Sequence, residues 1–113
     1  MIARRETLLW AVQRATAMVL AFCVLVHLAT IIYAVRAGLS AGAILGRTQG
    51  SFLWGTFYGV FVIAVAIHAA LGMRVIVAEW LRMKGAAAGL VVGAFGALLA
   101  AMGLRAVVAV VAA

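Results

Sequence analysis

The stretch between residues 52 and 81 reads FLWGTFYGVFVIAVAIHAALGMRVIVAEWL. A helix needs about 20 apolar residues to cross the roughly 30 Å hydrocarbon core of a bilayer, and this run is longer than that. In lipid the backbone groups must be satisfied within one segment, so the run is predicted to be a transmembrane helix rather than a strand. His68 lies deep within it, and Arg74 and Glu79 follow before it ends.

Two further apolar runs, 8–35 and 86–113, are also long enough to span a membrane. The chain is 70% hydrophobic and 10% charged, a composition whose apolar surface a soluble domain of 113 residues could not bury. We therefore expect an all-α membrane protein, a single domain of three transmembrane helices at about 8–35, 52–81 and 86–113. The first run is longer than the 7–15 apolar residues of a signal peptide, so we expect it to be retained. The connection 36–51 has room for one short interfacial turn of helix.

The net charge of +7 comes from basic residues that stand singly between the apolar runs. This pattern favours membrane topology over nucleic-acid binding, and we expect no nucleic-acid partner. If the three runs span, Arg4, Arg5, Arg14, Arg74, Arg82 and Lys84 share one side, and Arg36, Arg47 and Arg105 the other. The positive-inside rule then places the N-terminus in the cytoplasm and the C-terminus outside. The expected location is the inner (cytoplasmic) membrane, as a multi-pass protein.

A single cysteine, Cys23, leaves no partner for an internal disulfide and no thiolate cluster for zinc or an iron–sulfur centre. Any redox centre held by this chain must therefore use other ligands.

Polar residues gather on one face of each of the first two expected helices. At about 100° per residue, the face of the first helix that carries His27 also carries Gln13, Thr16, Leu20, Cys23 and Thr30. On the second helix, Phe61, His68, Gly72 and Glu79 share a face. Such residues point into a helix bundle or a cofactor cavity, or hydrogen-bond to neighbouring helices.

An imidazole in hydrocarbon is costly and needs a partner, so His68 is the leading candidate for a functional site. The two common partners are a metal centre, above all haem iron, and a proton relay. Gly72, one turn after His68, removes a side chain where a flat macrocycle would approach the backbone. The third helix carries little chemistry, although Gly89 and Gly93 form a pair of small residues suited to close helix packing.

The segment His68-Ala69-Ala70-Leu71-Gly72-Met73-Arg74, followed by Glu79-Trp80, resembles the second-helix motif of the succinate dehydrogenase and fumarate reductase membrane-anchor subunits. That motif is a histidine, three variable residues, a glycine, one more residue and often an arginine, with an acidic residue near the helix end. The segment Gln13-Arg14-Ala15-Thr16-Ala17 is similar to the family's first-helix signature. The resemblance covers most of residues 8–84.

The resemblance implies a haem b ligated by His68. It also implies a ubiquinone or menaquinone site at the cytoplasmic end near Arg14 and Trp80, with Gln13 in its vicinity. Arg14 and Arg74 are the cations available for haem propionates or quinone. The implied partners are a flavoprotein and an iron–sulfur protein, so the chain would take part in electron transport of the tricarboxylic acid cycle without itself oxidising succinate. Two departures weaken the quinone assignment: Trp10 replaces a serine common in the family, and Trp80 stands where some relatives have tyrosine.

His27 is a candidate second ligand for iron, with hydrogen bonding inside the membrane as its alternative role. A depth estimate argues against one haem between His27 and His68. By the helix rise of 1.5 Å per residue, His27 lies about 7 Å outward of the midplane and His68 about 3 Å inward. Three alternatives follow: a histidine from a second anchor chain, His68 from another copy of this chain, or two separate haems. The resemblance favours a second anchor chain, because two similar anchors in the family commonly each give one histidine from the second helix.

Three other functions remain open at this stage. The chain could be a haem-free anchor with the same fold, another quinone-linked b-type cytochrome, or a small proton-coupled transporter using His27, His68 and Glu79. Glu79 lies near a helix end rather than at the midplane, where transporter sites usually lie. Relaying protons to quinone and pairing with Arg82 or Lys84 are alternative roles for Glu79.

Overall fold

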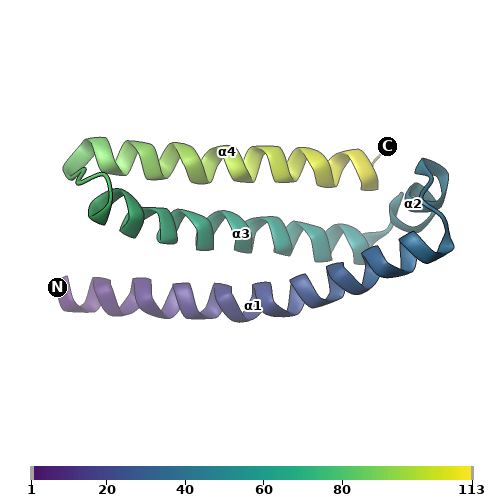
Figure 1. The fold of residues 1–113 in the computed structure, drawn as a ribbon, viewed down its shortest axis with the longest axis horizontal. Coiled ribbons are helices and arrows are strands. Elements are labelled where there is room, and N and C mark those ends of the chain that lie inside the picture. Colours follow the sequence, from purple (N-terminus) through teal and green to yellow (C-terminus); the bar gives the residue numbers. More distant parts are fainter. Residues whose placement is uncertain (1, 113) are drawn as a thin grey trace.

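The computed structural model describes residues 2–112, and these residues form four helices (Figure 1). They are α1 (Ile2–Ala37), α2 (Ala41–Thr48), α3 (Phe52–Glu79) and α4 (Gly85–Val111). Helices α1, α3 and α4 are long and apolar enough to cross a membrane, which confirms the prediction of an all-α protein with three transmembrane helices. The expected end of the third helix, at residue 113, falls outside the described residues.

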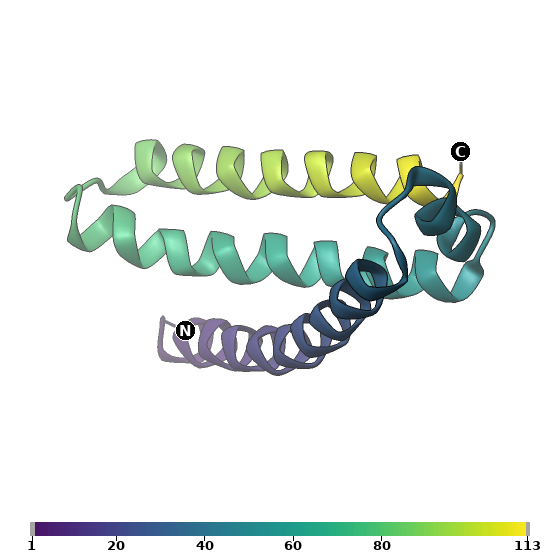
Figure 2. The same ribbon diagram turned by 45° about the vertical axis from the view of Figure 1, so that its right-hand side comes forward.

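The first helix starts earlier than the apolar run suggested. Helix α1 has 36 residues, which at 1.5 Å per residue corresponds to about 54 Å. It therefore extends beyond a hydrocarbon core of about 30 Å, and its charged N-terminal turns continue the helix outside the apolar run. Gly38, with φ of 102°, follows its last residue and provides the left-handed conformation that commonly ends a helix. The helix bows along its length (Figure 2).

The connection after α1 holds a longer helix than the expected single turn. Helix α2 has eight residues and begins after Ser40, whose side chain accepts a hydrogen bond from the Ala43 backbone N–H. Ser51 caps α3 in the same way. Both serines satisfy helix N-termini that would otherwise leave backbone donors unpaired.

Helix α2 is tied to the end of α4. The Thr48 hydroxyl donates to the Val110 carbonyl oxygen at 2.7 Å, and the Gly50 N–H donates to the Val111 carbonyl oxygen at 2.7 Å. The last carbonyls of a helix have no partner within it, so these two bonds complete the C-terminus of α4. Thr48 is 4% exposed.

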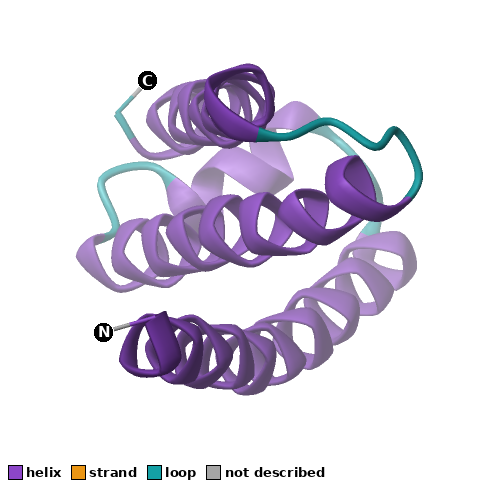
Figure 3. Ribbon diagram, turned by 90° about the vertical axis from the view of Figure 1, so that its left-hand side faces the viewer, coloured by secondary structure: helices purple, strands orange, loops and turns teal. Residues whose placement is uncertain are grey.

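Helix α3 lies between α1 and α4 and packs against both (Figures 1 and 3). The N-terminus and the α3–α4 connection lie at one end of the molecule; α2 and the C-terminus lie at the other. The chain is elongated, with principal extents of 50, 24 and 23 Å. This order places the His68 face of α3 against α1, and the opposite face against α4.

Glycines allow α3 and α4 to approach closely, but not the pair expected from the sequence. A Cβ added at Gly103 would lie 2.5 Å from Val62 Cγ1, and one at Gly96 would lie 3.1 Å from Ala70 Cβ. Nothing lies within 4 Å of such an atom at Gly89 or Gly93. The prediction that Gly89 and Gly93 allow close helix packing is therefore wrong for the helix contacts within residues 2–112. The face of α4 that packs on α3 carries Gly96 and Gly103 instead.

Replacing Thr48 by valine should destabilise the α2–α4 junction. The change keeps the side-chain shape and leaves a carbonyl of α4 without its donor, which we expect to cost about 1 kcal/mol. Thermal unfolding of the detergent-solubilised chain measures the effect. Thr56→Val, an exposed position near the start of α3, is the control. Equal unfolding temperatures for the two variants would contradict this role of Thr48.

Candidate functional site

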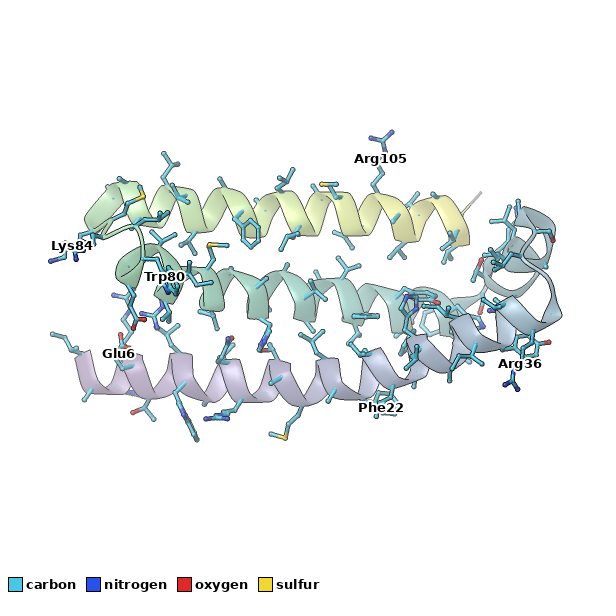
Figure 4. All side chains as sticks on the ribbon, in the orientation of Figure 1. Glu6, Phe22, Arg36, Trp80, Lys84 and Arg105 are labelled. Atoms are coloured by element: carbon cyan, nitrogen blue, oxygen red, sulfur yellow. The ribbon has the colours of Figure 1, made fainter. Side chains whose placement is uncertain are left out.

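The polar face predicted for α1 is confirmed by its burial in the structure. Cys23 is 2% exposed, and the other polar members of the face are shielded to an intermediate degree: Gln13, Thr16, His27 and Thr30. Phe22, one residue from Cys23, is exposed and points away from α3 (Figure 4). The face is turned inward because α3 packs on that side of α1.

His68 contacts α1 directly. Its Nδ1 lies 3.2 Å from the Thr16 hydroxyl, and both side chains are partly buried. Gly72 lies one turn further along α3, and a Cβ added there would meet only Gln13 Nε2, at 3.8 Å. His68 and Thr16 therefore mark one level of the α1–α3 interface, with little side-chain bulk beside it at Gly72.

His27 lies at a different level. Its ring makes edge-to-face contacts with Tyr58 and Phe61, at centroid distances of 5.7 and 5.6 Å. Phe61 precedes His68 by seven residues on α3, which corresponds to about 10 Å along the helix. The structure thus separates the two imidazoles along the helix axes instead of facing them toward one point.

An apolar cavity lies beside His27, at the end of the molecule that holds α2. It has a volume of about 590 Å³, and its walls come from all four helices. Besides His27, its polar lining residues are Thr48 and Tyr58. A cavity of this size and polarity suits a lipid-soluble molecule or an apolar side chain of another chain. Among residues 2–112, no three His, Cys, Asp or Glu residues gather closely enough to bind a metal ion. His27 and His68 therefore do not belong to a larger cluster of metal-ligand residues within this part of the chain.

Arg74, six residues after His68 on α3, contacts α1 near its N-terminal end. Its Nη1 lies 3.6 Å from a carboxylate oxygen of Glu6, and the Arg74 and Glu6 side chains are 42% and 56% exposed. Arg74 Nε and Gln13 Oε1 are buried and have no hydrogen-bond partner among residues 2–112. Both helices therefore carry a buried polar atom that is free to bind a ligand: an N–H donor on Arg74 and an amide oxygen acceptor on Gln13.

The other residues predicted near a quinone are at the same end but are not enclosed. Arg14 lies over the Trp10 ring, 5.5 Å from its centroid, and is exposed. Trp80 is 80% exposed and lies near Lys84 at the α3–α4 connection (Figure 4). Glu79 is exposed, and within the described residues it forms no ion pair with Arg82 or Lys84.

Glu6 is the residue that the sequence did not point to. It is one of the two acidic residues of the chain, and it precedes the apolar run by two positions. No signal in the sequence marks it, because its contact with Arg74 depends on how α1 and α3 are aligned along their axes. With Thr16 opposite His68, Glu6 lies ten positions earlier on α1 and Arg74 six positions later on α3. Their levels along the helices therefore differ by about 6 Å, and the two long side chains span that difference. Arg74, a cation at the edge of the membrane, then meets a carboxylate there.

Comparison with known proteins identifies the fold family. The family model described as the succinate dehydrogenase/fumarate reductase transmembrane subunit matches residues 1–112. No curated protein and no solved structure matches the chain. Because the match covers nearly the whole chain and includes all three membrane-spanning helices, the chain belongs to the family of succinate dehydrogenase/fumarate reductase transmembrane subunits.

Proposed function

We propose that this chain is the haem b-binding membrane anchor of a succinate dehydrogenase or fumarate reductase, and that it passes electrons between a docked iron–sulfur subunit and membrane quinone. The observation that carries the proposal is the position of His68. It is a partly buried imidazole in the membrane-spanning part of α3, within a family that anchors such complexes. An imidazole in that position has few roles other than holding a metal centre or relaying protons.

The residues around His68 fit a haem. His68 supplies a nitrogen ligand, and Gly72 leaves the next turn of α3 without a side chain. Arg74 is a guanidinium with an unpaired buried Nε, suited to a propionate carboxylate. Its pairing with Glu6 uses one nitrogen at 3.6 Å in an exposed position, which is a weak interaction that a propionate can replace.

When bound, haem b supplies one-electron transfer between the iron–sulfur subunit and quinone. The chain's own part is to hold it. His68 would ligate the iron, Arg74 would balance the carboxylate charge of the haem, and the apolar residues of α1 and α3 would keep water away from it. A second histidine ligand would favour electron transfer over oxygen chemistry.

The second histidine ligand would come from another polypeptide. His27 is at the level of Phe61, about 10 Å from His68 along α3, so the two rings do not face one macrocycle. We propose a histidine from a second anchor chain or from another copy of this chain. Such a partner would lie on a face of the α1–α3–α4 layer that the chain itself leaves open.

The quinone site is proposed at the N-terminal end, near Gln13, Arg14 and Trp80. Arg14 and Trp80 are exposed and offer a cation and an indole N–H to a quinone carbonyl. Since this chain does not enclose them, partner subunits would form the rest of the site. The flavoprotein and iron–sulfur protein would dock at this end, on the cytoplasmic side of the inner membrane. The cluster Arg4, Arg5, Arg82 and Lys84 supports that orientation.

Replacing Arg14 by alanine is expected to impair quinone reaction more than haem binding. Loss of a charged hydrogen-bond donor costs about 1.5–3 kcal/mol, or roughly 10- to 100-fold in quinone affinity. The measurement is the quinone KM of the purified complex alongside its haem content. Arg105→Ala, which removes a cation pointing away from α3 near the other end, is the matched control (Figure 4). Wild-type quinone kinetics in Arg14→Ala would remove Arg14 from the site.

Affinity purification tests the anchoring role itself. A tagged chain, isolated from its native membrane in mild detergent, should carry with it polypeptides that contain covalent or tightly bound flavin and iron–sulfur clusters. Flavin fluorescence and electron paramagnetic resonance identify these centres directly. A preparation with neither centre, obtained under conditions that preserve the chain's fold by circular dichroism, would reject the anchor function.

A further inference from the structure

The hydroxyl of Thr16 sits between its own helix and the imidazole of His68. Its Oγ1 lies 2.9 Å from the Val12 carbonyl oxygen, 3.1 Å from the Gln13 carbonyl oxygen and 3.2 Å from His68 Nδ1. A threonine hydroxyl has one hydrogen and two lone pairs. Carbonyl oxygens only accept, so the hydrogen goes to the backbone of α1, where the shortest contact is, and a lone pair faces His68.

A lone pair on Thr16 is best met by a hydrogen on Nδ1 of His68. In a neutral imidazole one nitrogen carries the hydrogen and the other has a free lone pair. We propose that Thr16 is a positioning residue that holds His68 as the Nδ1–H tautomer and thereby keeps Nε2 as its iron-binding nitrogen. The inference rests on the proposed haem function and extends it to the residue of α1 that prepares the ligand.

The physical benefit of this contact lies in orientation and basicity. Metal-bound histidines almost always donate their other N–H to an acceptor, which fixes the ring and strengthens the nitrogen that binds the metal. Here the acceptor is on α1 and the ligand on α3. Packing of these two helices therefore sets the tautomer of His68 before haem arrives.

His27 has the opposite arrangement. Its Nδ1 is buried and has no hydrogen-bond partner among residues 2–112. Burying an N–H without an acceptor is costly, so the hydrogen of His27 belongs on Nε2 and Nδ1 carries the lone pair. His27 lacks the acceptor that prepares His68, and it therefore serves as an internal control in the same membrane.

Three variants separate the hydroxyl from its surroundings. Thr16→Val removes the hydroxyl and keeps the branched shape, whereas Thr16→Ser keeps the hydroxyl. Thr30→Val is the matched control, because Thr30 makes the same bond to its own helix, to the Val26 carbonyl oxygen at 2.8 Å. A general effect of losing such a bond in α1 would appear in both valine variants.

The first readout needs no haem. Solid-state NMR of the full-length, haem-free chain in lipid bilayers, with ¹⁵N-labelled histidine, reports which ring nitrogen carries the hydrogen; His27→Ala assigns the two signals. We expect His68 to be Nδ1–H in the wild type, Thr16→Ser and Thr30→Val. In Thr16→Val we expect it to shift toward Nε2–H, while His27 stays Nε2–H throughout. A wild-type His68 with Nε2–H, or one unchanged in Thr16→Val, would overturn the proposal.

The second readout uses the haem-loaded complex. Losing the hydrogen bond that a metal-bound histidine donates from its other nitrogen typically lowers metal affinity about 10- to 100-fold. Thr16→Val should therefore lose haem more readily, and Thr16→Ser should retain it. The haem midpoint potential should rise in Thr16→Val, because a less electron-rich imidazole stabilises ferric iron less. If Thr16→Val retains haem as well as the wild type and has the same midpoint potential, the positioning role of Thr16 is rejected and the haem assignment stands. A haem-free wild-type complex whose His68 tautomer still depends on Thr16 would reject the haem assignment instead.

Discussion

Replacing His68 by alanine is expected to abolish haem binding while the chain still inserts and assembles. The side chain is the only imidazole at its level of the α1–α3 interface among the described residues, so its removal would take away this chain's ligand for the proposed haem. Membrane insertion depends on three apolar helices that the substitution does not change. Haem content per complex, measured as the pyridine haemochrome, should fall to near zero.

His27→Ala is the matched control for this experiment. It removes the other membrane imidazole of the chain, which contacts Tyr58 and Phe61 instead of Thr16. Haem should remain in His27→Ala if the second ligand comes from another polypeptide. Loss of haem in both variants would favour a sandwich within one chain, and an unchanged haem content in His68→Ala would remove His68 as a ligand.

Replacing Gly103 by alanine is expected to have the largest effect on stability. The added Cβ would lie 2.5 Å from Val62 Cγ1 and 2.9 Å from Val62 Cγ2, which is closer than two non-bonded carbon atoms approach in proteins. Either Val62 changes its rotamer or α4 moves away from α3, and overpacking of this kind typically costs about 1–3 kcal/mol. Thermal unfolding of the purified complex, followed by circular dichroism, measures the loss.

Two further variants make the Gly103 result specific. Gly93→Ala on the same helix adds the same methyl group where nothing lies within 4 Å, so its unfolding temperature should stay near that of the wild type. Val62→Ala, combined with Gly103→Ala, removes the two clashing methyl groups and should recover part of the stability. Equal unfolding temperatures for Gly103→Ala and Gly93→Ala would contradict the close contact of α3 and α4 at Gly103.

The transmembrane helices and the inward face of α1 could be predicted because each follows from local sequence. Long apolar runs have one structural solution in lipid, and helical periodicity places Thr16, Cys23 and His27 on the same side. The tight α3–α4 connection likewise forced those two helices to be neighbours. These features need no knowledge of which residues meet across helices.

The contacts between helices could not be predicted in the same way. The choice of Gly103 over Gly93 depends on how α4 is rotated against α3, and α4 is apolar all round, so periodicity does not fix its rotation. The Glu6–Arg74 pair depends on the register of two antiparallel helices, and the sequence does not fix that register. The bonds from α2 to α4 join segments more than sixty residues apart.

Part of the candidate site could be predicted from the sequence, because some of its residues lie close together on one helix. His68 and Gly72 are one turn apart, so their common face on α3 follows from helix geometry. The contact between Thr16 and His68 joins two helices and required the structure. The depth estimate that separated His27 from His68 used only the helix rise, and the structure places their contacts at different levels of α3.

The most direct test of the proposed haem b is a reduced-minus-oxidised visible spectrum of the purified wild-type complex, isolated with the proposed flavin and iron–sulfur subunits. We predict a b-type haem spectrum whose reduced form is reoxidised on addition of quinone. A complex that retains flavin and iron–sulfur clusters but shows no haem absorbance would contradict this account and leave a haem-free anchor in its place.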